Sequence, residues 1–186
     1  PILAQSLTGR VSVYRLTASK AGVEASQSIS VTITCAVPWF FGDQNAPADA
    51  GCPQALGASA AGAYQSFERG QMIYVTASGL NRIYGLQNDG SRYIAYPNTW
   101  DNTTLNNTPA PPNLFIPQQM FNWIYYTTNA PIGAWSQQVG WATGNIDQSA
   151  RTIQFEANSP RFYIDVPGGG VFRFSGGDSG TWQRIR

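Results

Sequence analysis

The sequence predicts a mainly β protein, with an N-terminal β-hairpin arm followed by two small β-meander repeats with short helices. Three observations predict this class. Short runs rich in β-branched and aromatic residues recur along the chain, turn residues such as Asp-Gly separate them, and the second half repeats the pattern of the first. The 186 residues, 42% of them hydrophobic, suffice to bury a core.

Few residues carry charge. Charged residues make up 11% of the chain, against about a quarter of a typical soluble domain. The net charge is +1 and the only lysine is Lys20, so the cations are scattered arginines and form no basic stripe for nucleic acid. No apolar run reaches the roughly 18 residues of a membrane span. We therefore expect neither a nucleic-acid partner nor a membrane-spanning segment. Because the chain starts at Pro1 with strand-like sequence, we expect a processed mature protein or a fragment.

Two runs at the start predict the hairpin arm, residues 1–34. GRVSVYRLTAS (residues 9–19) and SISVTIT (residues 28–34) are rich in β-branched residues, and the second alternates apolar with polar positions. The stretch KAGVEASQ (residues 20–27) is the expected connection. The pair of runs resembles the last two strands of an immunoglobulin-like or PKD-type extracellular domain.

The expected arm has an apolar face that needs a cover. Period-two alternation places Ile29, Val31 and Ile33 on one side, and the first run contributes Val11 and Val13 as candidate residues of the arm. A lone hairpin is only marginally stable, and free strand edges pair with other chains. We expect these five residues to pack on the rest of the chain or on another copy of it.

Cys35 and Cys52 are the only cysteines. With no histidine in the chain, a metal site is not expected, and a disulfide closing a loop of about 18 residues fits better, contributing roughly 3 kcal/mol in the chain-entropy model. Two free buried thiols are the alternative. A disulfide indicates an oxidising compartment, so we expect an extracellular or cell-surface protein.

Beyond Cys52, an alanine-rich stretch (residues 53–64) could hold a short helix. Three strand-like runs follow, and Asn-Asp-Gly at residues 88–90 predicts a hairpin turn between the last two. These runs are QMIYVT (71–76), NRIYGLQ (81–87) and SRYIAY (91–96).

A polar and proline-rich connector precedes the second repeat. Phe121, Ile124 and Tyr125 would then share a face of a short helix, which Pro131 limits. The predicted organisation is an arm (1–34), a disulfide loop with the first repeat (35–100), the connector (101–118) and the second repeat (119–186).

The second repeat aligns with the first at separations of 88 to 90 residues. The matches are Phe67-Glu68 with Phe155-Glu156, Tyr74 with Tyr163, Ile83-Tyr84 with Val171-Phe172, and Asp89-Gly90 with Ser179-Gly180. We expect Phe67, Phe155, Tyr74 and Tyr163 to be core residues, because short strands need large side chains to exclude water.

The run Gly-Asp-Ser-Gly at residues 177–180 resembles the surroundings of the nucleophilic serine in trypsin-like proteases. Such a serine needs a base, and the chain has no histidine, which leaves Lys20 as the only candidate. The alignment places Ser179 on Asp89, inside a hairpin turn. We therefore interpret this run as a turn.

The stretches YQSFERGQMIY and IYGLQNDGSRY, with VGWATG at residues 139–144, resemble a repeat of secreted and surface-anchored bacterial proteins and are distantly similar to LGFP repeats. The resemblance covers residues 52–186. The second unit departs from it, because FEANSPRF lacks the Arg-Gly pair after Glu156. The resemblance implies attachment to a cell surface or wall and no particular catalytic activity.

Other residues suggest alternative functions. Glu68 and Glu156 could act as a glycosidase pair, although a glutamate after a buried phenylalanine more often accepts backbone N–H groups. Exposed tryptophans could stack on sugar rings. The candidates for sugar contact are Trp39, Trp100, Trp135 and Trp182.

Asn102 and Asn106 each begin a glycosylation sequon. Asp89, Asp101 and Asp178 do not form a calcium-loop motif, so no metal and no cofactor are expected. The sequence thus predicts a non-enzymatic extracellular structural module of bacterial type, which joins copies of itself into an assembly or filament through its arm. A carbohydrate- or cell-wall-binding module is the alternative, and a glycoside-active enzyme is a more distant one.

Overall fold

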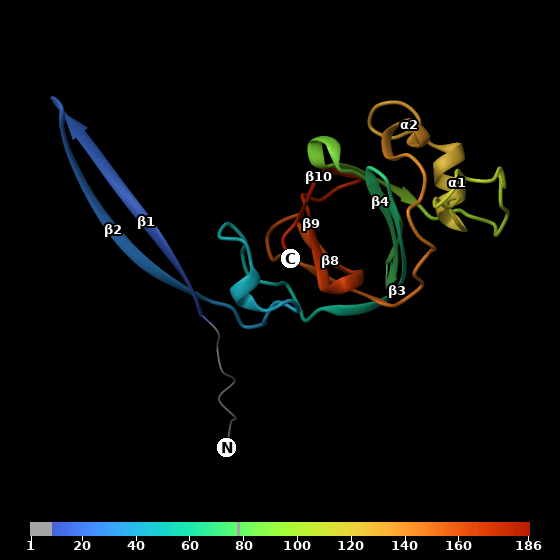
Figure 1. Cartoon of the computed structure of the whole chain (residues 1–186). Coiled ribbons are helices and arrows are strands. Elements are labelled where there is room, and N and C mark those ends of the chain that lie inside the picture. Colours follow the sequence, from blue (N-terminus) through green and yellow to red (C-terminus); the bar gives the residue numbers. More distant parts are fainter. Residues whose placement is uncertain (1–8, 78) are drawn as a thin grey trace, which may run out of the picture.

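The computed structural model describes residues 9–77 and 79–186, without the side chains at positions 9–13, 33 and 90. It shows a closed barrel of eight antiparallel strands, two short helices on the outside of the barrel, and a separate two-stranded arm (Figure 1). The mainly β class, the arm and the short helices predicted from the sequence are confirmed.

The arm consists of β1 (Gly9–Lys20) and β2 (Val23–Thr34), which pair along their whole length. Ala21 and Gly22 connect them with φ angles of 51° and 79°. Two consecutive positive φ values are typical of a two-residue type I′ turn, whose twist suits a hairpin. The predicted connection at residues 20–27 is therefore wrong, because this tight turn lets the pairing continue to the tip.

The barrel consists of two four-stranded meanders that correspond to the two predicted repeats. The first contains β3 (Ala58–Phe67), β4 (Gly70–Ala77), β5 (Leu80–Gln87) and β6 (Arg92–Pro97). The second contains β7 (Arg151–Phe155), β8 (Phe162–Val166), β9 (Gly170–Phe174) and β10 (Ser179–Arg184). Strand β3 pairs with β7 and β6 pairs with β10, which closes the sheet.

The alanine-rich stretch 53–64 is not a helix, because β3 begins at Ala58. Its small side chains serve close packing. Ala60 and Ala63 are buried, and a Cβ at Gly62 would overlap the side chain of Arg151. Contacts with neighbouring strands therefore override the high helix propensity of alanine.

Two helices and three short 3₁₀ turns are the other elements of the described residues. Helix α1 (Met120–Thr127) buries Phe121, Ile124 and Tyr125, as predicted, and α2 (Trp135–Val139) follows it. The 3₁₀ turns are η1 (Asp43–Asn45), η2 (Asp89–Ser91) and η3 (Pro167–Gly169). Turn η2 connects β5 to β6 at the predicted Asp-Gly position.

Aromatic rings fill much of the barrel interior. The ring of Phe174 stacks on Phe162 at a centroid distance of 4.7 Å, and Tyr84 lies 5.2 Å from Phe174. Aliphatic side chains occupy the remaining space. The buried members are Ile73, Val75, Leu86, Ile153, Ile164 and Val166.

Each meander is covered by a segment that precedes the other meander. The first covering segment (residues 35–57) leads into β3 but packs on the second meander, where Trp39 contacts Tyr163. The second covering segment (residues 98–147) leads into β7 but packs on the first meander, where α1 and α2 bury Ile83. The two segments lie on opposite sides of the barrel (Figure 1).

Two fully buried glutamines, Gln65 on β3 and Gln154 on β7, hold these segments in equivalent ways. Each amide donates to two backbone carbonyls and accepts one backbone N–H. The carbonyls belong to Ile116 and Gly144 for Gln65, and to Pro38 and Ala55 for Gln154; the N–H groups belong to Gln118 and Phe40. The glutamines are therefore the matching residues of the two repeats.

The two glutamines are 89 positions apart in the sequence, whereas the Phe-Glu pairs were aligned at a separation of 88. The structure therefore corrects that part of the sequence alignment by one position. It places Phe67 on Glu156 and not on Phe155. Because neighbouring strand residues face opposite sides, the shift changes the environment of both phenylalanines. Phe67 is buried as predicted, whereas Phe155 is 41% exposed at one end of the barrel.

The Gly-Asp-Ser-Gly run is part turn and part strand. Gly176 and Gly177 have φ angles of 100° and 79° in the turn, but Ser179 and Gly180 already belong to β10 and pair with β6. The alignment of Ser179 with Asp89 is therefore wrong. Gly180 is required on the strand because a Cβ there would overlap Ser175 Oγ.

Candidate functional site

The arm is the most exposed element of the described structure, and its two faces differ. The strand register places Tyr14 opposite Ile29 and Leu16 opposite Gln27. The apolar face contains Tyr14, Leu16, Ala18, Val23, Ala25, Ile29 and Val31, together with Gln27 and, at the tip, Lys20. Its five large hydrophobic side chains are 41% to 77% exposed. The other face carries serine, threonine, Arg15 and Glu24.

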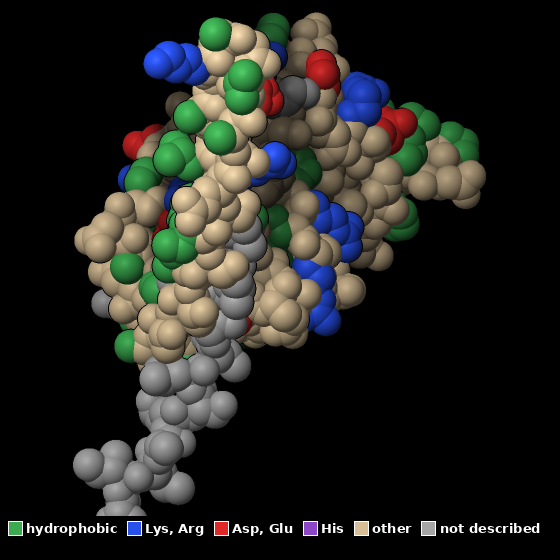
Figure 2. All heavy atoms as spheres, turned by 90° about the vertical axis from the view of Figure 1, so that its left-hand side faces the viewer, with side chains coloured by type: hydrophobic (Ala, Val, Ile, Leu, Met, Phe, Trp, Pro, Cys, Tyr) green, Lys and Arg blue, Asp and Glu red, His purple; other side chains and the backbone are tan. Residues whose placement is uncertain are grey.

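The described large side chains of this face are all exposed, although η1 of the first covering segment lies close to β1. Figure 1 shows the arm projecting away from the barrel, and Figure 2 shows hydrophobic side chains open to view along it. At about 3.4 Å per residue, twelve-residue strands make the arm roughly 40 Å long. The arm therefore presents a long apolar surface to solvent or to a partner.

The predicted arm residues divide into two groups. Ile29 and Val31 lie on the apolar face and are exposed. The side chains of Val11, Val13 and Ile33 lie outside the described residues. The sequence prediction that this arm carries an apolar face thus rests on the first two residues.

Sequence reasoning missed Tyr14, Leu16 and Val23. Tyr14 and Leu16 alternate with Arg15 and Thr17, so the signal was present. It becomes clear only with the strand register, which brings residues of both strands to one face.

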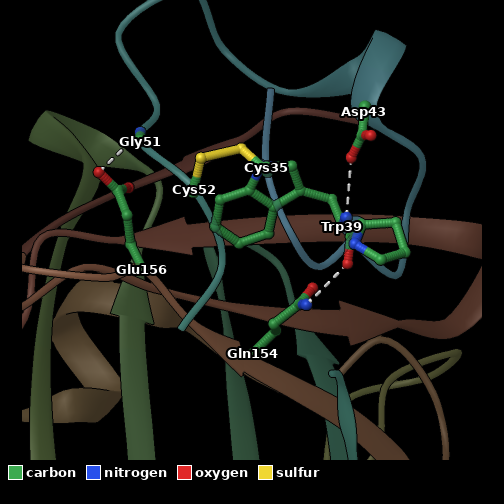
Figure 3. Close-up of a disulfide and its surroundings, with 8 residues drawn as sticks. Cys35, Trp39, Asp43, Gly51, Cys52, Gln154 and Glu156 are labelled. Carbon is green, nitrogen blue, oxygen red and sulfur yellow. Dashed lines mark hydrogen bonds between the residues drawn. A yellow bond between two sulfur atoms is a disulfide. The ribbon is translucent and has the colours of Figure 1, made fainter. Parts of the chain in front are cut away.

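A disulfide ties the base of the arm to the barrel. Cys35 directly follows β2 and is bonded to Cys52, as predicted, with their Cα atoms 5.4 Å apart (Figure 3). The next residue, Pro53, forms a bridge with Glu156, next to β7. The disulfide and this β-bridge therefore connect the arm to the second meander without passing through the loop between the cysteines.

Trp39 anchors that loop. Its backbone N–H donates to Asp43 Oδ1 at 2.8 Å (Figure 3). Its ring lies 4.5 Å from the ring of Tyr163. The neighbouring Pro38 carbonyl accepts from Gln154 Nε2 at 3.0 Å. The tryptophan is therefore a packing residue between the loop and β8.

A charged cluster fixes the end of the loop. Asp49 receives two hydrogen bonds from Arg173, at 2.8 and 2.6 Å, and one from Arg161 at 2.9 Å. The Arg173 guanidinium lowers the pKa of Asp49 to about 2. Glu156, which is buried, accepts from Gly51 N–H at 2.9 Å and from Arg161 at 2.5 Å.

Both repeat glutamates accept backbone N–H groups, as predicted. Glu68 accepts from Trp141 at 2.9 Å and Glu156 from Gly51. The N–H groups belong to the covering segments and not to the following turn. Burial, and then the nearby Glu156 carboxylate, raise the pKa of Tyr163, which donates to Glu156. The arrangement ties segments together and gives Glu156 no access to a substrate.

The four predicted sugar-contact tryptophans are largely covered. Trp39 and Trp135 are buried, and Trp182 is buried with its Nε1 donating to Gln87 O. Trp100 is half-buried against the cluster around α1 and donates to Thr103 O. A covered ring offers no free face to a sugar, so the structure does not bring these residues together as a binding surface.

The other candidate residues are also separate from one another. Ser179 is exposed on β10, whereas Lys20 lies at the tip of the arm. Asn102 is exposed, and the side chain of Asn106 accepts from Thr108. In residues 9–77 and 79–186, no three His, Cys, Asp or Glu side chains are grouped as a metal site requires.

Comparisons with known proteins give no neighbour. No family model, no curated protein and no solved structure matches the chain. Over the same described residues, no helix is long and apolar enough to cross a membrane.

Proposed function

We propose that this protein is a non-enzymatic extracellular structural module, a subunit that joins other copies of itself through the arm. The observation that carries this proposal is the amphipathic hairpin with its uncovered apolar face. The disulfide supports an extracellular location, because such bonds persist in oxidising compartments.

The exposed apolar area supports association at high concentration. The exposed fractions of Tyr14, Leu16, Val23, Ile29 and Val31 together amount to about three whole side chains. Burial of these would contribute about 5–9 kcal/mol. Association itself costs at least about 4 kcal/mol, so the face alone supports a weak contact.

A second copy is the occupant that fits this face. Two hairpins packed face to face would bury both apolar surfaces and leave both serine-rich faces in water, which is the arrangement of a small β-sandwich. Because both copies use the same surface, the contact has twofold symmetry and closes. The outer edges of β1 and β2 stay free in such a dimer, and pairing along them would continue the assembly.

The area of the apolar face also indicates that the outer edges of β1 and β2 take part in a stable contact. Two strands about 40 Å long and spaced about 5 Å apart offer on the order of 400 Å² per copy. A specific protein interface takes about 800 Å² per partner. Main-chain pairing along the edges therefore supplies the remaining contact in a stable assembly.

Two neighbouring residues provide a matched test. Leu16 lies on the apolar face and Thr17 on the polar face. We expect the wild-type protein to associate as its concentration rises, Leu16→Asp to stay monomeric, and Thr17→Asp to behave as wild type. Light scattering and analytical ultracentrifugation up to millimolar concentration measure this. A monomeric wild type, or equal effects of the two substitutions, would contradict the proposal.

The alternatives have less support. Carbohydrate binding through the predicted tryptophans lacks an exposed ring, and a glycosidase pair lacks a free Glu156 carboxylate. No observation on these tryptophans or on Glu156 therefore favours carbohydrate binding or glycoside hydrolysis over assembly through the arm.

A further inference from the structure

Two hollows lie beside β6 and β10. One has a volume of about 310 Å³ and the other about 460 Å³, and Thr181 lines both. The covering segments pack on β3–β5 and on β7–β9, whereas outward-facing Ser179 and Thr181 on β10 are exposed. The two hollows, here called the β10 groove, therefore lie between the covering segments.

The groove is lined by groups that suit a polyhydroxylated ligand. Ser175, Thr181 and Gln183 bring hydroxyl and amide groups to the smaller hollow. Ser175 Oγ accepts from the Thr181 N–H at 3.0 Å, and its side chain also hydrogen-bonds Tyr93, so the side chains of Thr181 and Gln183 are the more accessible polar groups. Ile94 and Pro131 give the larger hollow a small apolar surface, against which the C–H face of a sugar ring can pack.

The lining is positively charged. Arg92, Arg161 and Arg173 line the two hollows, and no carboxylate does. Asp49 and Glu156 pair with Arg161 and Arg173 from outside the groove. Arg92 has no ion-pair partner among the described residues, so the groove keeps about one unbalanced positive charge.

We propose that the β10 groove binds an oligosaccharide that carries carboxylate groups. Hydroxyl and amide groups recognise the sugar hydroxyls, and Arg92 recognises a carboxylate. Addition of a peptide strand is disfavoured, because Ser179–Thr181 already pair with β6 at the floor of the groove. One unbalanced cation is too little for a nucleic-acid backbone. This site is independent of the arm, and of the four candidate tryptophans only the buried Trp182 contributes to its lining, in the smaller hollow.

The smaller hollow is held in shape before any ligand binds. The Asp49 carboxylate accepts two hydrogen bonds from Arg173, at 2.8 and 2.6 Å, and one from Arg161 at 2.9 Å. A fixed guanidinium loses little freedom on binding, so it is a suitable wall for a weakly binding sugar.

Isothermal titration calorimetry with hexamers of galacturonate, glucuronate and mannuronate tests the proposal, with the methyl esters of the same hexamers as uncharged probes. We expect at least one acid hexamer to bind and its ester to bind more weakly. Arg92→Gln should weaken binding of the acid about two- to fivefold, as expected for a solvent-exposed charge pair. Thr181→Tyr should abolish binding, because Thr181 lines both hollows and a larger side chain there obstructs each of them. Thr104→Tyr, on an exposed loop of the second covering segment, is the matched control and should bind as wild type.

Four results would overturn parts of this proposal. Absence of binding by all acid hexamers removes the site. Equal binding of acid and ester, or no effect of Arg92→Gln, removes the role of the carboxylate. Wild-type binding by Thr181→Tyr removes the location. If Thr181→Tyr fails to fold, Gln183→Ala replaces it, since this exposed residue lines only the smaller hollow, and unchanged binding then counts against the location.

Discussion

Gly85 shows how a single missing side chain shapes the outside of the barrel. It lies on β5 under the indole of Trp135, and a Cβ at this position would overlap that ring. Trp135 is fully buried there, at the start of α2. A glycine inside a strand weakens the strand but allows close approach of another group. At this position it lets α2 pack on the first meander.

We expect Gly85→Ala to lower the free energy of unfolding by about 1–3 kcal/mol, because the added methyl group displaces Trp135 from its site. Urea unfolding followed by tryptophan fluorescence measures the change. Gly144→Ala is the control. Its nearest side-chain atom would be 3.8 Å from the new Cβ, so it should change stability by less than about 0.5 kcal/mol. Equal effects of the two substitutions would show that the indole does not depend on Gly85.

Asp49 gives the fold a dependence on acid pH. Its pKa is lowered from 3.8 to about 2, first by hydrogen bonds from Arg173. A carboxyl group with a lowered folded-state pKa stabilises the protein above its unfolded pKa and loses this effect as the pH falls. Because the side chain is 63% exposed, its ion pairs contribute no more than about 1 kcal/mol.

Asp49→Asn should therefore be less stable than wild type at pH 5, and the difference should disappear between pH 4 and pH 2. Thermal unfolding at half-unit steps of pH checks this. Asp89→Asn is the control, since Asp89 is exposed and forms no ion pair in the described structure. A stability difference for Asp49→Asn that stays constant down to pH 2 would show that the carboxylate charge is not responsible.

At the scale of elements, local patterns predict the strands well where a turn residue separates them. The runs at residues 71–76, 81–87 and 91–96 became β4, β5 and β6, and Asp-Gly marks the turn between the last two. The alanine-rich stretch before them was uncertain, because small residues suit both a helix and a close strand crossing. Only the position of Arg151, far along the chain, decides between the two.

The register of the repeat was the harder inference. Alignment of the two Phe-Glu pairs by residue identity shifted the repeat register by one position. Residue identity alone does not show which face of a strand a side chain lies on. The matching contacts belong to Gln65 and Gln154, whose partners lie in segments of unrelated sequence. The two glutamines occupy equivalent positions in the two repeats, and this is visible in the sequence. Nothing in the neighbouring sequence, however, indicates that their side chains are buried.

The candidate site was predictable only in part, for the same reason. An alternating hairpin with a disulfide at its base follows from period two and from the cysteine count. The burial of Trp39 and Trp135 does not follow from the sequence, because each tryptophan is covered by an element that is distant in sequence. The β10 groove could not be predicted either, since it exists only where two covering segments end.

At the scale of the whole molecule, the covering segments are exchanged between the repeats. The first covering segment (residues 35–57) protects the second meander, and the second (residues 98–147) protects the first. Strand pairing adds to this, because β3 pairs with β7 and β6 with β10. Each repeat therefore leaves its own apolar outer face uncovered and two strand edges unpaired when it is alone.

This exchange predicts that the chain cannot be divided after β6 into two independent folding units. Fragments 35–97 and 98–186 should each lack a cooperative thermal transition, because each contains the cover for the other meander and not its own. When mixed, they should associate and regain the circular dichroism spectrum of residues 35–186, which serves as the intact control and shows that the arm is not needed for the barrel. Size-exclusion chromatography and thermal unfolding measure both results. A cooperative transition in either fragment alone, at the midpoint of the intact control, would show that the exchanged covers do not hold the two repeats together as one folding unit.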